Sequence, residues 1–570
     1  MARPSAGPIL RSVTLLALLA GCPRPTSDWP PGHLPAGWTP TTYTESIAVE
    51  DAGSPLPDQW WRTAVFYELH VRSFKDSDGD GYGDLKGLIS KLDYIHDLGA
   101  TALYLLPIAK DSDHYHGYTI IDFRGVDPAY GTMADVTELV QQAHARGMAV
   151  VLDFVGEYSS PEHPFFEDAM DYGGYRQWYL WAGADPGWPN PYFPGSGVWY
   201  AAERGGGYYY SMYFGEPAFD YRNLSVRAYM RDNLRFWLNA GADGFRFDSV
   251  STLFVYGRDQ QVDQPANHAY FQAMRRDILD AYANRFTIAE DGDTTPYLGD
   301  GTNEFHAGFD MDWARTVMGA IAAEDSTAFS GVISRPDSAP AGAMFGTLLA
   351  NHDTVKPRAY TLFGGDEAKC KLAATVLLTS PGIPFVYYGE EVGMEILEDG
   401  HFIGPPPPWN DERLRSPMQW DASANAGFST GTPYLGINDD YADHNVAEAS
   451  ADPGSILAHF KKMIALRKGS AALLSGTTAE ARTSSPASSF AFVRSRGASK
   501  VAVVLNLSGS AQTVLVDLTG TPLAVTSGRA TAAADLYDGA TQFGDITPSN
   551  RAGYSVSVPA RGAMILPFTY

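Results

Sequence analysis

Three short apolar runs of the sequence end on polar residues that could perform acid–base chemistry. Because side chains alternate along an extended strand, Arg246 and Asp248 would lie on the same face of one strand. If the three runs are neighbouring parallel strands, the carboxylates at their ends converge on one pocket. The three motifs are Gly244-Phe245-Arg246-Phe247-Asp248, Thr287-Ile288-Ala289-Glu290 and Leu348-Leu349-Ala350-Asn351-His352-Asp353.

Carboxylates that meet in this way have the composition of a glycosidic-bond cleavage site. One carboxylate acts as the nucleophile, and a second, with a raised pKa, acts as the acid. A cationic arginine beside the nucleophile keeps it ionised. A single aspartate at a strand end is more simply a helix cap or a surface residue. Three such strand ends, in this order, favour the interpretation as a catalytic site.

The motifs need a scaffold, and the chain alternates short apolar runs with helix-like stretches. This alternation is typical of parallel βα units, and about eight of them make an α/β fold of the (β/α)8 TIM-barrel type. An open, doubly wound sheet is the alternative. The predicted strands are 64–71, 102–106, 149–155, 244–247, 286–289, 343–349 and 383–388, and the predicted helices include 88–98, 135–145, 226–239 and 268–283.

Two stretches break the alternation. Residues 159–222 are dense in Gly, Pro, Trp and Tyr and are too long for an ordinary loop, which predicts a small inserted domain after the third strand. Residues 475–570 show period-two runs separated by Gly and Ser, which predicts a terminal antiparallel β-sandwich. The barrel would then comprise 58–158 and 223–474.

Composition excludes several classes of protein. The chain has 570 residues and a net charge of −25, which argues against a nucleic-acid-binding protein and against attraction to anionic lipid. Its two cysteines, Cys22 and Cys370, exclude a disulfide scaffold. The oligomeric state stays open.

On these motifs the chain resembles the α-amylase family of glycoside hydrolases, of the family 13 type, from Trp60 to Tyr570. The match to the last barrel strand is Gly382–Glu391. The stretch Arg415-Ser416-Pro417-Met418-Gln419-Trp420 is similar to one in the α-glucosidase and trehalose synthase branches. The resemblance implies a retaining enzyme with Asp248 as nucleophile, Glu290 as acid/base, Asp353 as transition-state stabiliser, and Arg246, His352, Tyr118 and Tyr158 as substrate-binding residues.

An acidic loop follows the first predicted strand. Alternating carboxylates with glycines between them can wrap a hard cation such as Ca²⁺. The loop begins like an EF-hand, with Gly81 at its sixth position, but the twelfth position is Gly87 instead of Glu. The family carries a similar calcium loop. The predicted Ca²⁺ ligands are Asp76, Asp78, Asp80, Asp84 and the carbonyl of Tyr82, with a solvated acidic turn as the alternative.

The chain departs from the family pattern near the expected sugar pocket. Thr119 stands where the family has the Asp of Gly-Tyr-Asp. Glu157 and Tyr158 stand where the family has Asn-His, and Glu157 could still bind a metal there. Ser251 and Thr252 replace the Lys-His of many starch-cleaving amylases. These changes put a preference for long α-1,4 chains in question.

The N-terminus indicates export. Residues 13–20 form an apolar run of signal-peptide length, after Arg3 and Arg11, and the run leads to Leu19-Ala20-Gly21-Cys22. This resembles a bacterial lipoprotein signal over 1–22, with Cys22 lipidated. Residues 23–57 would be a Pro-rich tether, and the lipid anchor would be the only membrane contact. An ordinary secretory signal and an uncleaved N-terminal anchor are the alternatives.

Three functions follow from the sequence. The first is a retaining hydrolase of α-glucans or malto-oligosaccharides. The second is a maltose-acting glucosyltransferase or isomerase of the trehalose synthase type, which Tyr67–Phe74 resembles. The third is a catalytically weak sugar-binding lipoprotein, suggested by Thr119 and Tyr158. Linkage and chain-length preference are not determined by these motifs.

Overall fold

The computed structural model describes residues 37–353, 357–397 and 411–569. Its centre is a closed barrel of eight parallel strands in the order β1-β2-β5-β9-β10-β11-β12-β13, as the sequence predicts. Nearly every strand residue is buried, because helices cover the outer face and side chains fill the interior. The strands are β1 (Phe66–Leu69), β2 (Ala102–Leu105), β5 (Ala149–Phe154), β9 (Gly244–Phe247), β10 (Phe286–Ala289), β11 (Ala307–Phe309), β12 (Met344–Leu348) and β13 (Ile383–Tyr387).

Helices begin where capping side chains satisfy free backbone N–H groups. In α5 the Thr132 side chain accepts from the Asp135 N–H and Asp135 accepts in return, which forms a capping box. The outer helices are α3 (Leu85–Ser90), α4 (Leu92–Leu98), α5 (Met133–Ala145), α7 (Leu224–Asn239), α8 (Pro265–Asp277), α9 (Met311–Ala323), α11 (Glu367–Thr379) and α13 (Ile456–Gly469). Short helices are α2 (Val71–Phe74), α6 (Pro164–Met170), α10 (Ala359–Leu362), α12 (Val446–Ala451) and α14 (Ala471–Ser475).

Several predicted boundaries are wrong. The first strand ends at Leu69, and α2 starts at Val71, because the buried Arg72 turns to pair with Asp111. The helix predicted over 88–98 is two helices, and the first starts at Leu85 because Asp84 caps it. β11 was not predicted, since three residues, one of them glycine, give no periodic signal.

The barrel interior is filled by large apolar side chains. Phe66 of β1 stacks on Phe385 of β13 with ring centroids 4.3 Å apart. A second, larger core lies between the strands and the surrounding helices. Packing of this kind makes the strands a rigid support for the residues that follow them.

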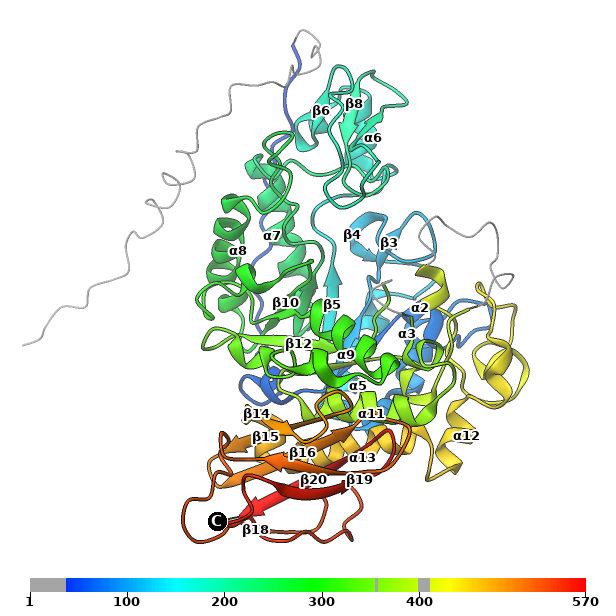
Figure 1. Cartoon of the computed structure of the whole chain (residues 1–570). Coiled ribbons are helices and arrows are strands. Elements are labelled where there is room, and N and C mark those ends of the chain that lie inside the picture. Colours follow the sequence, from blue (N-terminus) through cyan, green and yellow to red (C-terminus); the bar gives the residue numbers. More distant parts are fainter. Residues whose placement is uncertain (1–36, 354–356, 398–410, 570) are drawn as a thin grey trace, which may run out of the picture.

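The excursion after β5 carries a three-stranded antiparallel sheet in the order β6-β8-β7, formed by Trp181–Ala182, Tyr208–Tyr210 and Trp199–Ala201. It lies at one end of the barrel, and the C-terminal sheet lies at the other (Figure 1). Trp188, Trp199 and Tyr210 pack on one another inside it, with Trp188 and Trp199 ring centroids 5.2 Å apart. These aromatic residues therefore build the core of the insert.

The C-terminal strands form one seven-stranded antiparallel sheet in the order β18-β20-β16-β15-β14-β17-β19. Strand β14 pairs with β15 at its start and with β17 at its end, so both parts of the sheet enclose one core. The strands are β14 (Thr477–Thr483), β15 (Ser489–Arg496), β16 (Ser499–Asn506), β17 (Gln512–Asp517), β18 (Thr531–Ala532), β19 (Tyr554–Val558) and β20 (Gly562–Thr569).

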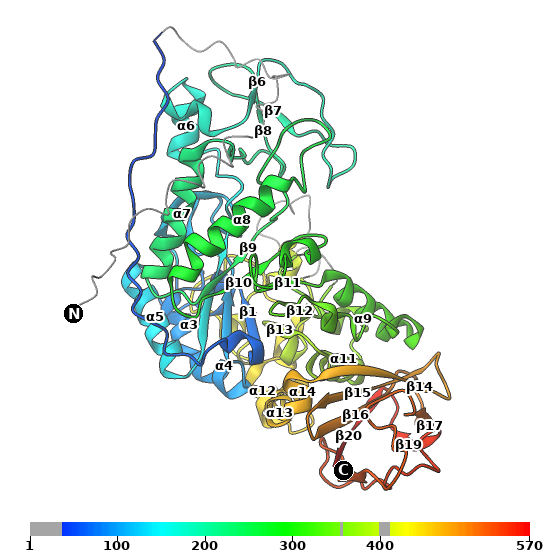
Figure 2. The same ribbon diagram turned by 90° about the vertical axis from the view of Figure 1, so that its left-hand side faces the viewer.

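Residues 37–57 contain no helix or strand and run along α7 (Figure 2). The Tyr43 ring lies edge-on to Tyr229, and the Ile47 N–H donates to Asp232. The part of the predicted tether that the structure describes is thus fixed to the barrel. The signal segment and Cys22 lie outside the described residues. None of the described helices is long and apolar enough to cross a bilayer.

Candidate active site

Arg246 is the centre of the polar cluster at the carboxyl end of the barrel. It points inward from β9 and is 1% exposed. One terminal nitrogen, Nη1, lies 2.9 Å from Asp153 Oδ1 and 2.5 Å from Asp248 Oδ1. The other, Nη2, lies 3.3 Å from Glu290 Oε2. A single guanidinium therefore holds three carboxylates that come from β5, β9 and β10.

Asp248 and Glu290 are the two members of this cluster that retain contact with the open side of the barrel. Their side chains are 12% and 18% exposed, whereas that of Asp153 is fully buried. The backbone N–H of Ser249 donates to Glu290 Oε2 at 3.2 Å. Burial, together with the negative charge of Asp248, raises the pKa of Glu290 to about 8, although Arg246 opposes the shift. At neutral pH Glu290 therefore carries the proton that a general acid donates.

Asp153 holds the cluster from its buried side, within β5. Tyr104 and Tyr118 both donate their hydroxyls to its Oδ2, at 2.8 and 2.7 Å. Burial raises its pKa to about 6 despite Arg246. Asp153 has no access to solvent, so its role is to orient Arg246 and the two tyrosines.

His352 lies between Glu68 of β1 and Tyr118. Its Nδ1 is 2.7 Å from Glu68 Oε1, and its Nε2 is 2.7 Å from the Tyr118 hydroxyl. Burial and the charge of Arg415 hold the pKa of His352 well below its usual value, and burial raises that of Glu68. Because Tyr118 gives its proton to Asp153, its hydroxyl oxygen can accept from Nε2–H of His352. Glu68 Oε1 bonds Nδ1 and also accepts from the His352 backbone N–H at 3.2 Å. This series of hydrogen bonds, from Glu68 through His352 to Tyr118, fixes the imidazole ring.

Asp353 follows His352 and is the most open of the three predicted catalytic carboxylates, with 41% of its side chain exposed. Its two oxygens lie 3.3 Å from His352 Nε2 and 3.4 Å from Arg415 Nη2. Arg415 also donates from Nε to the His352 carbonyl at 3.0 Å and pairs with Asp411 at 2.8 Å. Arg415 orients Asp353. Its place in the 415–420 stretch is the one feature of the sequence that could have indicated it.

Tyr158 is buried at the edge of the same cluster, and its ring centroid lies 5.6 Å from that of Tyr213. Burial and the charge of Asp248 raise its pKa well above the usual value, so it stays a neutral phenol. Thr119 is also buried, and its hydroxyl has no hydrogen-bond partner among the described residues. The structure thus places Tyr158 in the buried surroundings of the cluster, against Tyr213.

Two tyrosines of the insert reach the cluster and were not predicted. The Tyr213 hydroxyl donates to Ser249 Oγ at 2.6 Å, next to the nucleophile position. The hydroxyl of Tyr192, which is 37% exposed, bonds Ser251 and lies 3.3 Å from Asp291 Oδ1, next to Glu290. Both lie on loops, where no periodic pattern could have distinguished them from the other aromatic residues.

The predicted calcium loop brings three of its carboxylates together. Ligand oxygens of Asp76, Asp78 and Asp84 lie within 4.8 Å of one another. Asp80 is outside this group, and its Oδ1 accepts from the Tyr82 N–H at 2.8 Å. Gly81 has φ of 98°, and a Cβ there would meet the Thr432 carbonyl at 2.0 Å, so the close wrap of the loop requires glycine.

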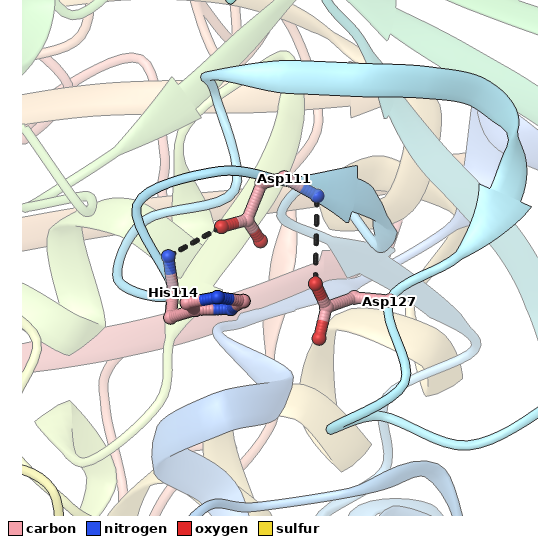
Figure 3. Close-up of side chains that lie close together, drawn as sticks. All are labelled: Asp111, His114 and Asp127. Atoms are coloured by element: carbon pink, nitrogen blue, oxygen red, sulfur yellow. Dashed lines mark hydrogen bonds between the residues drawn. The ribbon is translucent and has the colours of Figure 1, made fainter. Parts of the chain in front are cut away.

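A second group that meets the same distance criterion is Asp111, His114 and Asp127 (Figure 3). Here the Arg72 guanidinium lies 3.1 Å from Asp111 and 3.9 Å from Asp127. The arginine supplies the positive charge that a metal would bring. The group ties the end of β1 to the hairpin of β3 (Ala109–Asp111) and β4 (Ile120–Val126), and Tyr118 lies in the turn of that hairpin.

Comparison with known proteins identifies the family. The family described as alpha amylase, catalytic domain, matches residues 68–476. The chain belongs to this family, as its motifs predicted. It is an α-amylase-type glycoside hydrolase.

Curated relatives span several activities within the family. An oligo-1,6-glucosidase of Parageobacillus thermoglucosidasius is 31% identical, over 73% of this chain and 85% of that protein. A trehalose synthase/amylase of Mycolicibacterium smegmatis is 32% identical, over 81% and 85%. Among solved structures, an isomaltulose synthase of Erwinia rhapontici superposes with a TM-score of 0.77 at 27% identity, over 90% of this chain and 99% of that chain.

Proposed function

We propose that the protein is a retaining hydrolase of α-glucosidic bonds in α-glucans or malto-oligosaccharides. The observation that carries this proposal is the contact of one guanidinium with both Asp248 and Glu290. It favours the closely spaced pair of carboxyl groups that retention requires over the wider pair of inverting enzymes. The raised pKa of Glu290 assigns it the acid role and leaves Asp248 as the nucleophile.

The reaction runs in two displacements. Asp248 attacks the anomeric carbon while Glu290 gives its proton to the leaving oxygen, and a glycosyl-enzyme ester forms. Glu290, now ionised, takes a proton from water, which attacks the same carbon and releases Asp248. Arg246 remains in place throughout and offsets the negative charge left on Glu290 after the first displacement.

Asp353, His352 and Tyr118 act on the sugar. Asp353 faces the open side of the cluster beside Arg415, so it can stabilise the cation-like transition state. The neutral imidazole of His352 and the Tyr118 hydroxyl are fixed by Glu68 and Asp153, which suits them to bind sugar hydroxyls. The convergence of these groups disfavours a protein that only binds sugar.

A glucosyltransferase or isomerase of the trehalose synthase type is the second candidate. The identity to a trehalose synthase/amylase and the likeness to an isomaltulose synthase favour it. Such an enzyme uses the same first displacement but gives the glucosyl group to a sugar instead of water. Tyr192 and Tyr213 of the insert bond Asp291 and Ser249, the residues that follow Glu290 and Asp248, so the insert is placed to influence which acceptor reaches the ester.

Calcium is proposed for the loop at Asp76–Asp84, and the donor set fits it. Carboxylate oxygens from Asp76, Asp78 and Asp84 are the hard ligands that Ca²⁺ takes, and the Tyr82 carbonyl and Asp80 lie on the same loop. Burial and the neighbouring charge of Asp78 raise the pKa of Asp80, a repulsion that a cation would relieve. Bound there, Ca²⁺ would hold the loop and the start of α3 and would take no part in the chemistry.

Export with a lipid anchor at Cys22 is the proposed location. It rests on the apolar run 13–20 and on the Leu19-Ala20-Gly21-Cys22 motif. Mass spectrometry of the mature N-terminus tests it. An acylated Cys22 as the first residue is expected, and an N-terminus elsewhere with an unmodified cysteine would refute the anchor.

Product analysis tests the proposed function. The purified protein is incubated with starch, maltose, isomaltose and trehalose, with Asp248→Asn as the control. Glucose or short oligosaccharides, released first as the α-anomer, support a retaining hydrolase. Trehalose formed from maltose would move the second candidate to first place, and sugar binding without turnover would refute both.

A further inference from the structure

Residues 37–57, which we call the N-terminal strap, have no part in the reaction described above. The family domain matches residues 68–476, so the strap lies outside it. The strap contains no helix or strand, yet it runs along α7 from the insert toward the opposite end of the barrel (Figure 2). A segment of this kind needs partners on other elements for its backbone groups. Those partners indicate what the strap holds in place.

One end of the strap is bonded to the insert. The Thr41 N–H donates to the Gly174 carbonyl at 2.8 Å, and the indole N–H of Trp178 donates to the Thr41 carbonyl at 3.1 Å. The Trp38 indole adds a bond to the Gly173 carbonyl at 2.9 Å. A Cβ on Gly174 would collide with the Thr41 hydroxyl oxygen, so glycine is what admits the strap this close.

Trp178 lies at the root of the insert, where the excursion returns to the barrel. Its carbonyl accepts from the Asp220 N–H at 2.7 Å, and the next residue, Tyr179, pairs with Phe219. The ring of Tyr43 in the strap lies edge-on to that of Trp178, with centroids 6.4 Å apart. The strap therefore contacts the part of the insert that determines how the rest of it sits on the barrel.

The middle of the strap is organised around the Tyr43 hydroxyl. It donates to Asp232 Oδ2 at 2.9 Å and accepts from Arg124 Nη2 at 2.6 Å. Asp232 belongs to α7 and is 2% exposed, and the Ile47 N–H donates to the same Oδ2 at 3.0 Å. Two donors to this buried oxygen thus come from the strap. A buried carboxylate needs such donors, so the strap is part of the fold and not a loose tether.

Arg124 carries these contacts to the hairpin of β3 and β4. It lies in β4, its Nε donates to Asn233 Oδ1 of α7 at 2.8 Å, and its guanidinium lies over the Tyr229 ring of α7 at 5.2 Å. Arg124 therefore holds the hairpin against α7, and the Tyr43 hydroxyl holds Arg124. Tyr118 lies in the turn of this hairpin, two residues before β4.

The two elements that the strap holds both supply residues of the active site. Tyr118 of the hairpin donates to Asp153, as described above. Tyr213 of the insert donates to Ser249 Oγ at 2.6 Å, beside Asp248. Asp248 itself follows a barrel strand, which the apolar core supports. The strap is therefore coupled to the residues around the sugar more closely than to the nucleophile.

We propose that Tyr43 is a positioning residue that holds the β3–β4 hairpin and the root of the insert on α7. Tyr118 and Tyr213 thereby keep fixed places beside the carboxylate cluster. Without this support the sugar has to order both elements as it binds, so its affinity falls, while bond cleavage between Asp248 and Glu290 changes less. This role rests on the proposed function, because it concerns the binding of an α-glucoside.

Kinetics of three variants test this role on maltose and isomaltose, well below each melting temperature. Tyr43→Phe loses the hydroxyl and keeps the ring, and Tyr43→Ala loses both. Asp51→Ala is the matched control: at the far end of the strap, Asp51 accepts from the Ala283 N–H at 2.9 Å and from Arg285 at 3.3 Å, before β10.

Tyr43→Phe should raise KM by roughly three- to tenfold and leave kcat within about twofold of the wild type, and Tyr43→Ala should raise KM further. Asp51→Ala should lower the melting temperature and leave KM unchanged. An unchanged KM in Tyr43→Phe would overturn the proposal. An equal rise of KM in Asp51→Ala would also overturn it, because the strap would then act only through general stability.

Hydrogen exchange measured by mass spectrometry tests the same contacts in the free protein, without any turnover. Tyr43→Phe should speed exchange in residues 118–124, and Tyr43→Ala should also speed it in residues 174–180. Residues 283–289 should change in Asp51→Ala and stay as in the wild type in both Tyr43 variants. Wild-type exchange at 118–124 in Tyr43→Phe would overturn the proposal.

The outcomes separate this proposal from the proposed function. Faster exchange in the hairpin of a protein that turns over no α-glucoside would leave the role of Tyr43 as the support of the hairpin intact, and the proposed function would fail. Faster exchange in an active protein whose KM does not change would reduce the strap to a stabilising segment and overturn the proposal alone.

Discussion

Two carboxylate clusters follow strands at the same end of the barrel, and they balance their charge in different ways. Around Arg246, three carboxylates share one buried guanidinium. In the loop after β1, backbone N–H groups balance the negative charge of the carboxylates. The Asp76 carboxylate, for example, accepts from the N–H groups of Asp78, Gly79 and Gly81. A fixed cation leaves Asp248 and Glu290 open to a substrate, whereas main-chain donors shape a ring of oxygens suited to a hard cation.

The two clusters show how the surroundings of a carboxyl group decide whether it acts as an acid or as a metal ligand. Next to Arg246, burial separates the protonation states, so that Glu290 holds a proton and can serve as the acid. In the loop, the Ser429 hydroxyl and backbone N–H groups lower the pKa of Asp76 in spite of its burial, which keeps it anionic. Changes in the first cluster should therefore alter rate, and changes in the second should alter stability.

The largest effect is expected from Asp248→Asn. The amide cannot form the ester, so kcat/KM should fall by at least about a thousandfold, on the scale that removing a covalent nucleophile produces. Steady-state kinetics on maltose or isomaltose measure it, with circular dichroism as the check on folding. Retention of a tenth of the activity would remove Asp248 from the nucleophile role.

Arg246→Lys should have the next largest effect. A lysine has one compact charge and cannot bond three carboxylates with the planar fork of arginine, so we expect a loss of roughly a hundredfold in kcat/KM. Since Arg246 lowers the pKa of Glu290, the alkaline limb of the pH profile should move upward. A loss of activity without a shift of the alkaline limb would show that Arg246 does not control the pKa of Glu290.

The pH dependence of the wild type follows from Glu290. Its pKa of about 8 predicts that kcat/KM for maltose falls above that pH, as the acid loses its proton. Glu290→Gln should abolish the limb and leave little activity on maltose, but it should retain most of the first displacement with α-glucosyl fluoride. Equal losses on both substrates would contradict the acid role.

Removal of calcium should affect stability more than rate. A ligand present at about 100 times its Kd stabilises the fold by about 2.7 kcal/mol, so chelation should lower the melting temperature by several degrees. Asp78→Asn should do the same and make the protein insensitive to chelator. An unchanged melting temperature and no bound metal on elemental analysis would leave the loop as a solvated turn.

The smallest effect is expected from Tyr192→Phe. It removes the hydroxyl that lies 3.3 Å from Asp291 but keeps the ring, so hydrolysis should change by only a few-fold. The ratio of transfer products to free glucose at high maltose should change more than the total rate. If both stay constant, the insert does not select the acceptor.

Much of the site could be predicted from sequence because it lies on regular elements. Arg246 and Asp248 are two apart at the end of a strand, so their common face follows from alternation alone. The spacing of carboxylates and glycines in Asp76–Asp84 likewise predicts a loop whose side chains converge. The (β/α)8 barrel itself could be predicted from seven apolar runs with helices between them.

The rest depends on contacts between distant segments. Glu68 reaches His352 across 284 positions of the chain, and Arg415 reaches the His352 carbonyl across 63. Tyr192 and Tyr213 lie on loops whose path is set by the insert. Glu157 could be read as a departure from the family pattern, but its burial could not, because that depends on how the loop after β5 folds back.

The most direct test of the account is to trap the glycosyl-enzyme. A 5-fluoro-α-glucosyl fluoride forms the ester through its fluoride leaving group, and the ring fluorine slows the hydrolysis that follows. Mass spectrometry of the digested protein should show one added fluoroglucosyl group, carried by Asp248. Label on Glu290 or Asp353, or inactivation without any label, would contradict the retaining mechanism and the assignment of the carboxyl groups around Arg246.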